Sequence, residues 1–277
     1  MLVAWHPYDI GKIRRFRHVL VHGGFPVARN RLHFQIDGIV LFFELPFNDD
    51  GEVFFLREIA ETYDQLNHTL SFGIDKIWRR KGIAFLRPFS PKTILDIATG
   101  TGDLAISMYK KLRPDHIVGA DISLGMMEVG RKKVAAAGYS EHISFEQQDC
   151  TALTYEENSF DAVTAAFGVR NFENIEQGIS EMYRVLKPGG HIMILELSTP
   201  EHFPMRQLYQ IYSKTVIPFI GRLLSKEKVA YNYLPASIKV VPQGKVMTDL
   251  LTRQGFKQAR VRTFTFGICS LYTGSKE

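Results

Sequence analysis

Short apolar runs alternate with longer amphipathic segments through the middle of the chain. Each run has the length of an ordinary strand, and the segments between carry apolar residues every three or four positions, as a one-sided helix requires. Ser123 stands where a helix N-cap belongs, and Gly138 where a helix ends. Strands alternating with helices in this way indicate parallel βαβ units. The predicted strands are 93–97, 116–120, 143–147, 160–166 and 191–197, and the predicted helices are 103–112, 124–137 and 175–186.

Further elements flank this alternation. A stretch after Leu197 mixes aromatic and basic residues with single prolines, which we interpret as a helical insertion. Near the end of the chain, two alternating runs predict antiparallel strands joined tightly. The pattern therefore predicts an α/β, doubly wound, mostly parallel sheet of seven strands. The added elements are helices at 58–70, 75–85 and 243–254, the insertion at 200–233, and strands at 256–263 and 265–273.

Residues 1–52 have a different character from the rest. They hold no helical or strand period for long, and the part up to His33 is rich in Arg and poor in acids. A targeting peptide is one interpretation, but the first serine is Ser71, and such peptides are usually rich in serine. We expect an extension that is poorly structured or that results from a misplaced start, followed by one domain over 53–277.

Composition narrows the class of protein. The net charge of +5 is mild, which fits an ordinary globular enzyme and gives little support to nucleic-acid binding. Only two cysteines occur, Cys150 and Cys269, without a CxxC pair, so we expect neither a disulfide framework nor a metal site. No apolar run reaches the roughly 18 residues of a membrane helix, and we expect a cytoplasmic protein.

A glycine turn follows the first predicted strand. Gly100-Thr101-Gly102 lies between that strand and a helix, where glycine lets the chain turn sharply and a ligand approach closely. Asp121 ends the next strand, about 20 residues later, where an acid can accept hydrogen bonds from ribose hydroxyls. This pattern alone leaves two cofactors open, because Ala105 completes a loose dinucleotide motif.

Neighbouring acids favour one of these cofactors. Asp96 precedes the turn and Asp103 follows it; both would repel a pyrophosphate but suit a cationic ligand that carries an amino acid. Asp149, after the third strand, could accept a hydrogen bond from an adenine amino group. The turn at 187–190 and the closing antiparallel strands also match methyltransferase architecture. The sequence therefore favours S-adenosylmethionine over a dinucleotide.

Several motifs resemble the UbiE/MenG family of quinone C-methyltransferases. The resemblance covers about residues 55–275, and its first two blocks are far more specific than the glycine turn. These blocks are Tyr63-Asp64-x-x-Asn67-x-x-Leu70-Ser71-x-Gly73-x-Asp75-x-x-Trp78-Arg79 and Phe167-Gly168-Val169-Arg170-Asn171-Phe172. Later blocks are Tyr183 to Gly190, Leu195 to Ser198, Tyr233 to Ile238 and Thr265 to Ile268.

The resemblance implies a fold and a reaction. The fold is the Rossmann-like class I architecture of S-adenosylmethionine-dependent methyltransferases, with N-terminal lid helices (53–90) and a helical substrate cap (201–234). The reaction methylates a ring carbon of a polyprenylated quinol, turning demethylmenaquinol into menaquinol, while relatives methylate the benzoquinol precursor of ubiquinone. The implied cofactor contacts are Thr101, Asp121, Asp149 and Cys150. The chain departs from some members in having Ala166 where they have serine, which could remove one cofactor hydrogen bond.

The chemistry suggests roles for the specific blocks. A ring carbon becomes nucleophilic when the adjacent hydroxyl loses its proton, so the site must stabilise a quinolate. We hypothesise that Arg170 does so, directly or through water, while Asn171 orients a ring oxygen. Tyr63 or Asp64 on a lid helix could relay the proton, although Asp64 could equally form a cap or salt bridge within the lid. We expect Asn67 and Phe167 to contact the substrate as well.

The insertion suggests where a polyprenyl tail could go. Its aromatic and aliphatic side chains, with lysines and arginines nearby, could line a tunnel or rest on the inner face of the cytoplasmic membrane. A packed cap that touches no lipid remains the alternative, and a homodimer is left open. Other functions also remain: an O- or N-methyltransferase of a soluble molecule, or a non-catalytic partner. The apolar residues are Phe203, Leu208, Ile211, Tyr212, Val216, Ile217, Phe219 and Ile220, and the basic ones Lys214, Arg222, Lys226 and Lys228.

Overall fold

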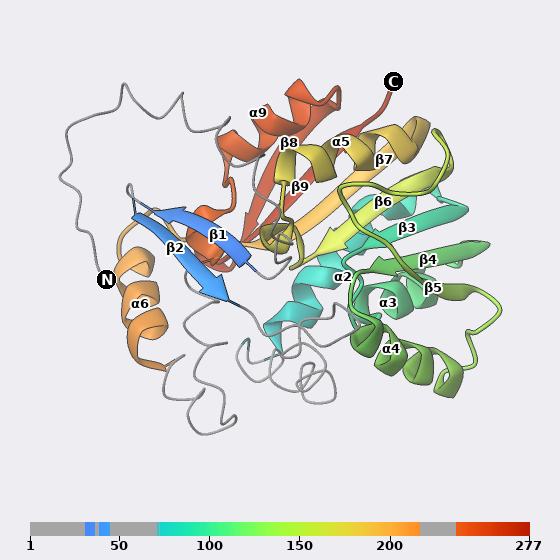
Figure 1. The fold of residues 1–277 in the computed structure, drawn as a ribbon, viewed down its shortest axis with the longest axis horizontal. Helices are drawn as coiled ribbons and strands as arrows, with labels where there is room; N and C mark the ends of the chain where they lie inside the picture. The colour runs from blue at the N-terminus through green and yellow to red at the C-terminus, as the bar shows by residue number, and fades with distance from the viewer. Residues whose placement is uncertain (1–30, 37–38, 45–70, 72, 217–236) are drawn as a thin grey trace, which may run out of the picture.

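Seven strands form one sheet in the order β5-β4-β3-β6-β7-β9-β8 (Figure 1). The computed structural model describes residues 31–36, 39–44, 71, 73–216 and 237–277. Strands β3 to β7 pair in parallel, and β9 runs antiparallel between β7 and β8. This confirms the predicted doubly wound sheet. The strands are β3 (Thr93–Ile97), β4 (His116–Asp121), β5 (Ile143–Gln147), β6 (Phe160–Ala166), β7 (Leu186–Leu197), β8 (Lys257–Phe264) and β9 (Cys269–Ser275).

Helices cover both faces of the sheet (Figure 1). Because successive side chains of a strand point to opposite faces, Ile94 enters one core while Leu95 and Ile97 enter the other. The Ile94 core includes side chains of α2, α3 and α4, and the Leu95 core those of α5 and α9. These helices are α2 (Ile74–Leu86), α3 (Asp103–Leu112), α4 (Leu124–Ala136), α5 (Ile175–Val185) and α9 (Lys245–Arg253).

Two strands begin more than two residues away from the predicted position. We expected α5 to reach residue 186 and the next strand to begin at 191, but β7 already begins at Leu186, which pairs with Phe160 of β6. The intervening turn also bonds to the far end of the chain, since Gly189 N–H donates to the Lys276 carbonyl at 2.7 Å. The last strand begins at Cys269 instead of 265, because residues 265–267 form a short 3-10 turn. The early start of β7 comes from pairing between distant segments, which local periodicity does not contain.

The remaining elements lie outside this layered core. A hairpin of β1 (Arg31–Ile36) and β2 (Ile39–Glu44) forms within the stretch where we expected little regular structure. The insertion begins as predicted with helix α6 (Met205–Ile211) and a π-helical turn (Tyr212–Val216). The predicted helix 58–70 and residues 217–233 of the insertion fall outside the described residues. In the part of the chain that the structure describes, no helix has the length and apolar character needed to span a membrane.

Candidate functional site at the carboxyl edge of the sheet

The glycine turn connects β3 to α3 in a conformation that two glycines make possible. Gly100 and Gly102 have φ angles of 56° and 77°, in the left-handed region that favours glycine. A Cβ on Gly102 would lie 2.7 Å from the ring of Phe145 on β5, so space as well as φ requires glycine here. Ala98 also has a positive φ, 51°, just before the turn. The strand end is therefore bent into a strained, closely packed loop of the kind found at ligand sites.

Asp96 supports this turn from inside the protein. Its carboxylate is 1% exposed and accepts hydrogen bonds from the hydroxyls of Thr99 and Thr164, both at 2.7 Å. Burial raises the pKa of Asp96 to about 6, against the lowering effect of the two hydroxyls. Asp96 thus links the end of β3 to β6 and to the turn. Its direct contact with a cofactor stays a prediction.

Asp121 joins the end of β4 to the same turn. Its carboxylate accepts hydrogen bonds from the backbone N–H of Gly100 at 2.8 Å and of Ser123 at 2.9 Å. Ser123 in turn caps α4 by accepting from the Met126 N–H, as the sequence predicted. The carboxylate oxygens are held at the edge where neighbouring strands end, which is where an acid would meet a ribose. That contact also stays a prediction.

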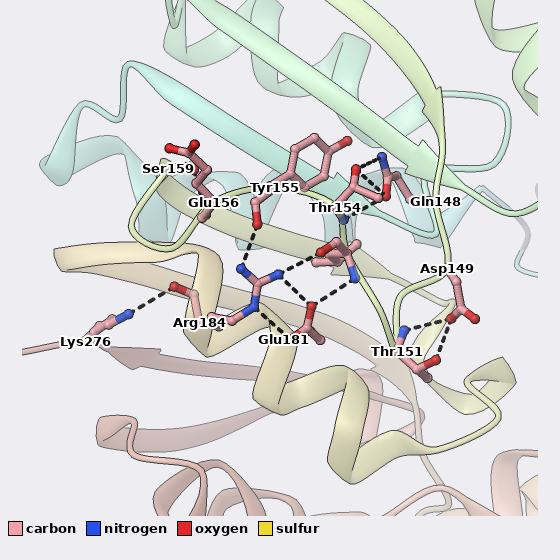
Figure 2. A network of polar contacts seen from close by, with 11 residues as sticks. Gln148, Asp149, Thr151, Thr154, Tyr155, Glu156, Ser159, Glu181, Arg184 and Lys276 are labelled. Carbon is pink, nitrogen blue, oxygen red and sulfur yellow. Dashed lines mark hydrogen bonds and ion pairs between the residues drawn. The ribbon is translucent and has the colours of Figure 1, made fainter.

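Hydrogen bonds to helix α5 hold the loop that follows β5 in place (Figure 2). Asp149 accepts from the N–H and the hydroxyl of Thr151, at 2.8 and 2.7 Å. Further along the loop, Arg184 of α5 donates to the Leu153 carbonyl at 2.8 Å, and Glu181 accepts from the Leu153 N–H at 2.9 Å. Arg184 and Glu181 also pair with each other at 2.7 Å. The loop that carries the proposed adenine contact is therefore anchored on a helix.

Cys150 is half-buried in this loop, and its thiol is not activated. Burial, with the nearby charge of Asp149, raises the pKa of its thiol to about 12, so the thiol stays protonated at neutral pH. Gln148, two residues before Cys150, ties the loop to β4, because its N–H donates to the Asp121 carbonyl at 3.0 Å. Cys150 is thus near the site as a neutral side chain, not as a nucleophile.

Charged side chains around the start of α3 are linked by a series of ion pairs. Asp103 pairs with Lys133 of α4 through a short contact and with Arg79 of α2 at 3.4 Å. Arg79 also pairs with Asp75 at 2.6 Å. Lys133 reaches the hydroxyl of Thr101 at 3.2 Å, and that threonine is 3% exposed. Two cations therefore offset Asp103, so this acid repels an anionic ligand much less than the sequence argument supposed.

The segment after β6 contacts the glycine turn directly. Phe167 has a φ of 61°, a strained value for an aromatic residue, and a Cβ on Gly168 would lie only 2.4 Å from that of Ala98. The Phe167 ring lies 6.1 Å from that of Trp78, and the Arg79 guanidinium is 5.5 Å from its centroid. The ends of β3 and β6 and helix α2 thus meet at one place. This is the switch point of the sheet, because β4 and β6 flank β3 on opposite sides.

Arg170 forms a buried ion pair that the sequence analysis did not foresee. Its guanidinium contacts Glu196, at the end of β7, at 2.8 Å, and the two side chains are 7% and 2% exposed. Arg170 also donates to the Phe167 carbonyl, while its backbone N–H donates to Glu196 at 3.2 Å. Asn171 is exposed, and its N–H donates to the Gly168 carbonyl at 2.9 Å. The pair therefore clamps the segment after β6 onto the next strand.

Helix α6 brings an aromatic side chain near this ion pair. Burial raises the pKa of Tyr209 to about 12, and the positive charge of Arg170 opposes that shift. Outward-facing residues of the same region are apolar: Phe203, Leu208 and Ile211 are 81%, 54% and 60% exposed. The described part of the insertion thus has one aromatic side chain within electrostatic range of Arg170 and exposes several apolar ones.

Most of the predicted site residues gather along this edge. The cofactor candidates lie at the ends of β3, β4 and β5, and Phe167, Arg170 and Asn171 follow β6. Tyr63, Asp64 and Asn67 fall outside the described residues. The sequence analysis missed the part played by Glu196 and Arg79, although both stand inside quoted motifs. The available signal for Glu196 was an acid directly after the apolar run Ile192 to Leu195.

Comparison with known proteins shows the family and the fold. The profile of the ubiE/COQ5 methyltransferase family matches residues 49–276. A demethylmenaquinone methyltransferase of Bacteroides fragilis is 56% identical over 236 residues, covering 83% of this chain and 96% of that protein. The ubiquinone/menaquinone biosynthesis C-methyltransferase UbiE of Geobacter sulfurreducens is 44% identical, covering 79% and 86%. A putative S-adenosylmethionine-dependent methyltransferase structure from Methanococcus maripaludis has a TM-score of 0.55 at 21% identity, covering 79% and 93%, and shares the fold.

Proposed function

Because the chain belongs to the ubiE/COQ5 methyltransferase family, we propose that it transfers a methyl group from S-adenosylmethionine to a ring carbon of demethylmenaquinol. The observation that carries the proposal is the 56% identity to a demethylmenaquinone methyltransferase over 96% of that protein. A benzoquinol of ubiquinone synthesis is the second candidate acceptor, since a 44% identical relative is named for both quinones. The two acceptors differ in the ring that the site must hold.

The carboxyl edge of the sheet suits the donor. S-adenosylmethionine supplies a methyl group already activated by attachment to a sulfonium sulfur. The protein must therefore bind it, orient it and exclude water, with reacting atoms about 3 to 3.5 Å apart. Gly100 and Gly102 provide a turn without side chains, Asp121 provides a carboxylate at the end of β4, and Asp149 one after β5. These groups match the glycine, ribose and adenine contacts expected of such a cofactor.

Arg170 and Asn171 are our candidates for stabilising the quinolate. The Arg170 guanidinium lies between Glu196 and the Phe167 carbonyl. Because this pair is buried, Arg170 is held rigidly, and a rigid donor costs no reorganisation when charge develops on the substrate. Glu196 offsets part of its charge, which favours a hydrogen bond to the ring oxygen over full ion pairing. We retain Tyr63 or Asp64 as the candidate proton relay.

The outward-facing part of the insertion is our candidate for contact with a membrane surface. Phe203, Leu208 and Ile211 are exposed apolar side chains, and Arg206 lies among them in the sequence. Apolar side chains with a neighbouring cation favour insertion at the interface of anionic lipid. Serine at all three apolar positions should reduce co-sedimentation with anionic liposomes, whereas serine at exposed Val261 of β8 should not. Equal binding by both variants would refute a role of the insertion.

The deciding experiment uses labelled S-adenosylmethionine with short-tailed demethylmenaquinol and benzoquinol in parallel. We expect methylated naphthoquinol as the main product; methylation of the benzoquinol alone would reassign the acceptor, and no transfer to either would refute the proposal. Arg170→Ala should reduce turnover far more than affinity for S-adenosylhomocysteine. Arg253→Ala is the control, because that side chain is 60% exposed on α9. Equal losses of turnover and affinity would contradict the assigned role of Arg170.

A further inference from the structure

Arg79 lies on α2 at the place where the turn after β3 and the segment after β6 meet. Its guanidinium is 3.4 Å from Asp103, the first residue after the glycine turn, and 5.5 Å from the ring centroid of Phe167. Its charge also partly opposes the burial that raises the pKa of Asp96. It therefore borders both the turn after β3 and the segment after β6, at the switch point where ligands bind in such sheets.

The contacts of Arg79 leave it able to bind a further anion. Asp75 holds it firmly at 2.6 Å, whereas the contact with Asp103 is longer, at 3.4 Å, and Asp103 has Lys133 as a second partner. Among the residues that the structure describes, the buried Nε of Arg79 has no hydrogen-bond partner. An incoming carboxylate could replace the long Asp103 contact without leaving that acid uncompensated.

The other cationic side chains near this edge of the sheet either contact other residues or are exposed. Lys133 lies on α4 and contacts both Asp103 and Thr101. Arg170 is paired with Glu196 in the neighbouring segment. Arg80, the next residue on α2, is exposed. Arg79 is the described cation that combines a partly buried side chain, 14% exposed, with contact to both Asp103, next to the glycine turn, and Phe167.

We propose that Arg79 binds the α-carboxylate of the amino-acid end of S-adenosylmethionine. A guanidinium presents two parallel N–H donors that match a carboxylate, which gives a strong and directional contact. Asp75, anchored by the Ser71 hydroxyl at 2.7 Å, holds the guanidinium in place. The inference rests on the proposed donor and holds whichever quinol is the acceptor.

Two ligands that differ in the amino-acid end provide the test. S-adenosylhomocysteine carries the carboxylate, and 5′-methylthioadenosine keeps the adenosine but lacks the whole amino acid. We expect Arg79→Gln to weaken S-adenosylhomocysteine binding by roughly 10- to 100-fold in calorimetric titration, the loss of a charge-assisted contact. Affinity for 5′-methylthioadenosine should stay unchanged. Arg80→Gln removes the same charge from the adjacent exposed position and should alter neither affinity.

The outcomes distinguish a direct contact between Arg79 and the ligand carboxylate from an indirect effect in which Arg79 only supports the glycine turn. Equal weakening of both ligands by Arg79→Gln, or no weakening of either, would overturn the proposal. Arg79→Lys, which keeps the charge but loses the paired donors, should give an intermediate affinity for S-adenosylhomocysteine alone. Should Arg79→Gln fail to fold, the unmodified protein decides: decarboxylated S-adenosylhomocysteine must bind it more weakly than the intact ligand. Failure of the unmodified protein to bind S-adenosylhomocysteine would instead count against the proposed donor.

Discussion

Replacing Glu196 with glutamine tests how much the buried ion pair contributes to stability. The substitution removes one charge from a pair whose side chains are 7% and 2% exposed, leaving the Arg170 guanidinium in the interior without its carboxylate. Breaking such a pair costs about 3 to 5 kcal/mol. We expect about 3 kcal/mol, the low end, because the glutamine oxygen can still accept from Arg170. For a chain of this size that corresponds to a fall of roughly 6–12 °C in Tm.

Urea unfolding followed by circular dichroism gives the free energy, and thermal unfolding gives Tm. The matched control is Asp249→Asn, which breaks the pair with Lys245 whose side chains are 49% and 83% exposed. It should cost less than about 0.5 kcal/mol. Adding Arg170→Met to Glu196→Gln should recover part of the loss, since the uncompensated charge is then gone. A Glu196→Gln protein as stable as the control variant would refute this reasoning.

Three further predictions concern the cofactor edge. The pKa of Asp96 is raised from 3.8 to about 6, so the folded state binds more protons than the unfolded state between these values, and the contribution of Asp96 to stability falls as pH rises. Asp96→Asn should abolish that slope in urea unfolding across the same pH window; an unchanged slope would contradict the assignment. Gly102→Ala should destabilise more than Gly138→Ala, because both glycines have positive φ but only Gly102 is crowded, by Phe145; equal unfolding free energies would show that the crowding is relieved. Iodoacetamide should label Cys150 far more slowly in the folded protein than in urea at neutral pH, measured by mass spectrometry, since its pKa is about 12; equal rates would disprove a suppressed thiolate.

Local periodicity was enough to predict the central strands. Strands β3, β5 and β6 have the predicted bounds, because β3 and β6 are short, mostly apolar runs and β5 alternates Ile143 and Phe145 with polar residues. The glycine turn and Asp121 were also recognisable, since a sharp turn and an acid at a strand end leave a signature in adjacent residues. The early start of β7 was not, because residues 187–190 become part of that strand only through contacts with β6 and the end of the chain.

Charge pairing was the least predictable part of the site. Arg170 was expected to stabilise the quinolate, directly or through water, and its ion pair with Glu196 was not predicted, because Glu196 comes from the next strand, 26 residues away. Asp103 was treated as an unopposed acid, yet Arg79 and Lys133 reach it from two different helices. A sequence shows which residues are charged, but the pairs depend on which strand and helix ends meet in space. The electrostatic character of the site therefore required the fold.

Because β9 lies between β7 and β8, it determines the order in which the strands at this edge of the sheet unfold. Within the described sheet β8 reaches β7 only through β9, although β8 comes earlier in the chain. Amide protons of β8 that are bonded to β9 can resist exchange with solvent only while β9 itself stays docked on β7. Opening should therefore proceed inward from β8, and the slowest-exchanging amide of β8 should exchange no more slowly than the slowest of β9. The protection of a strand is here limited by one that follows it in the sequence.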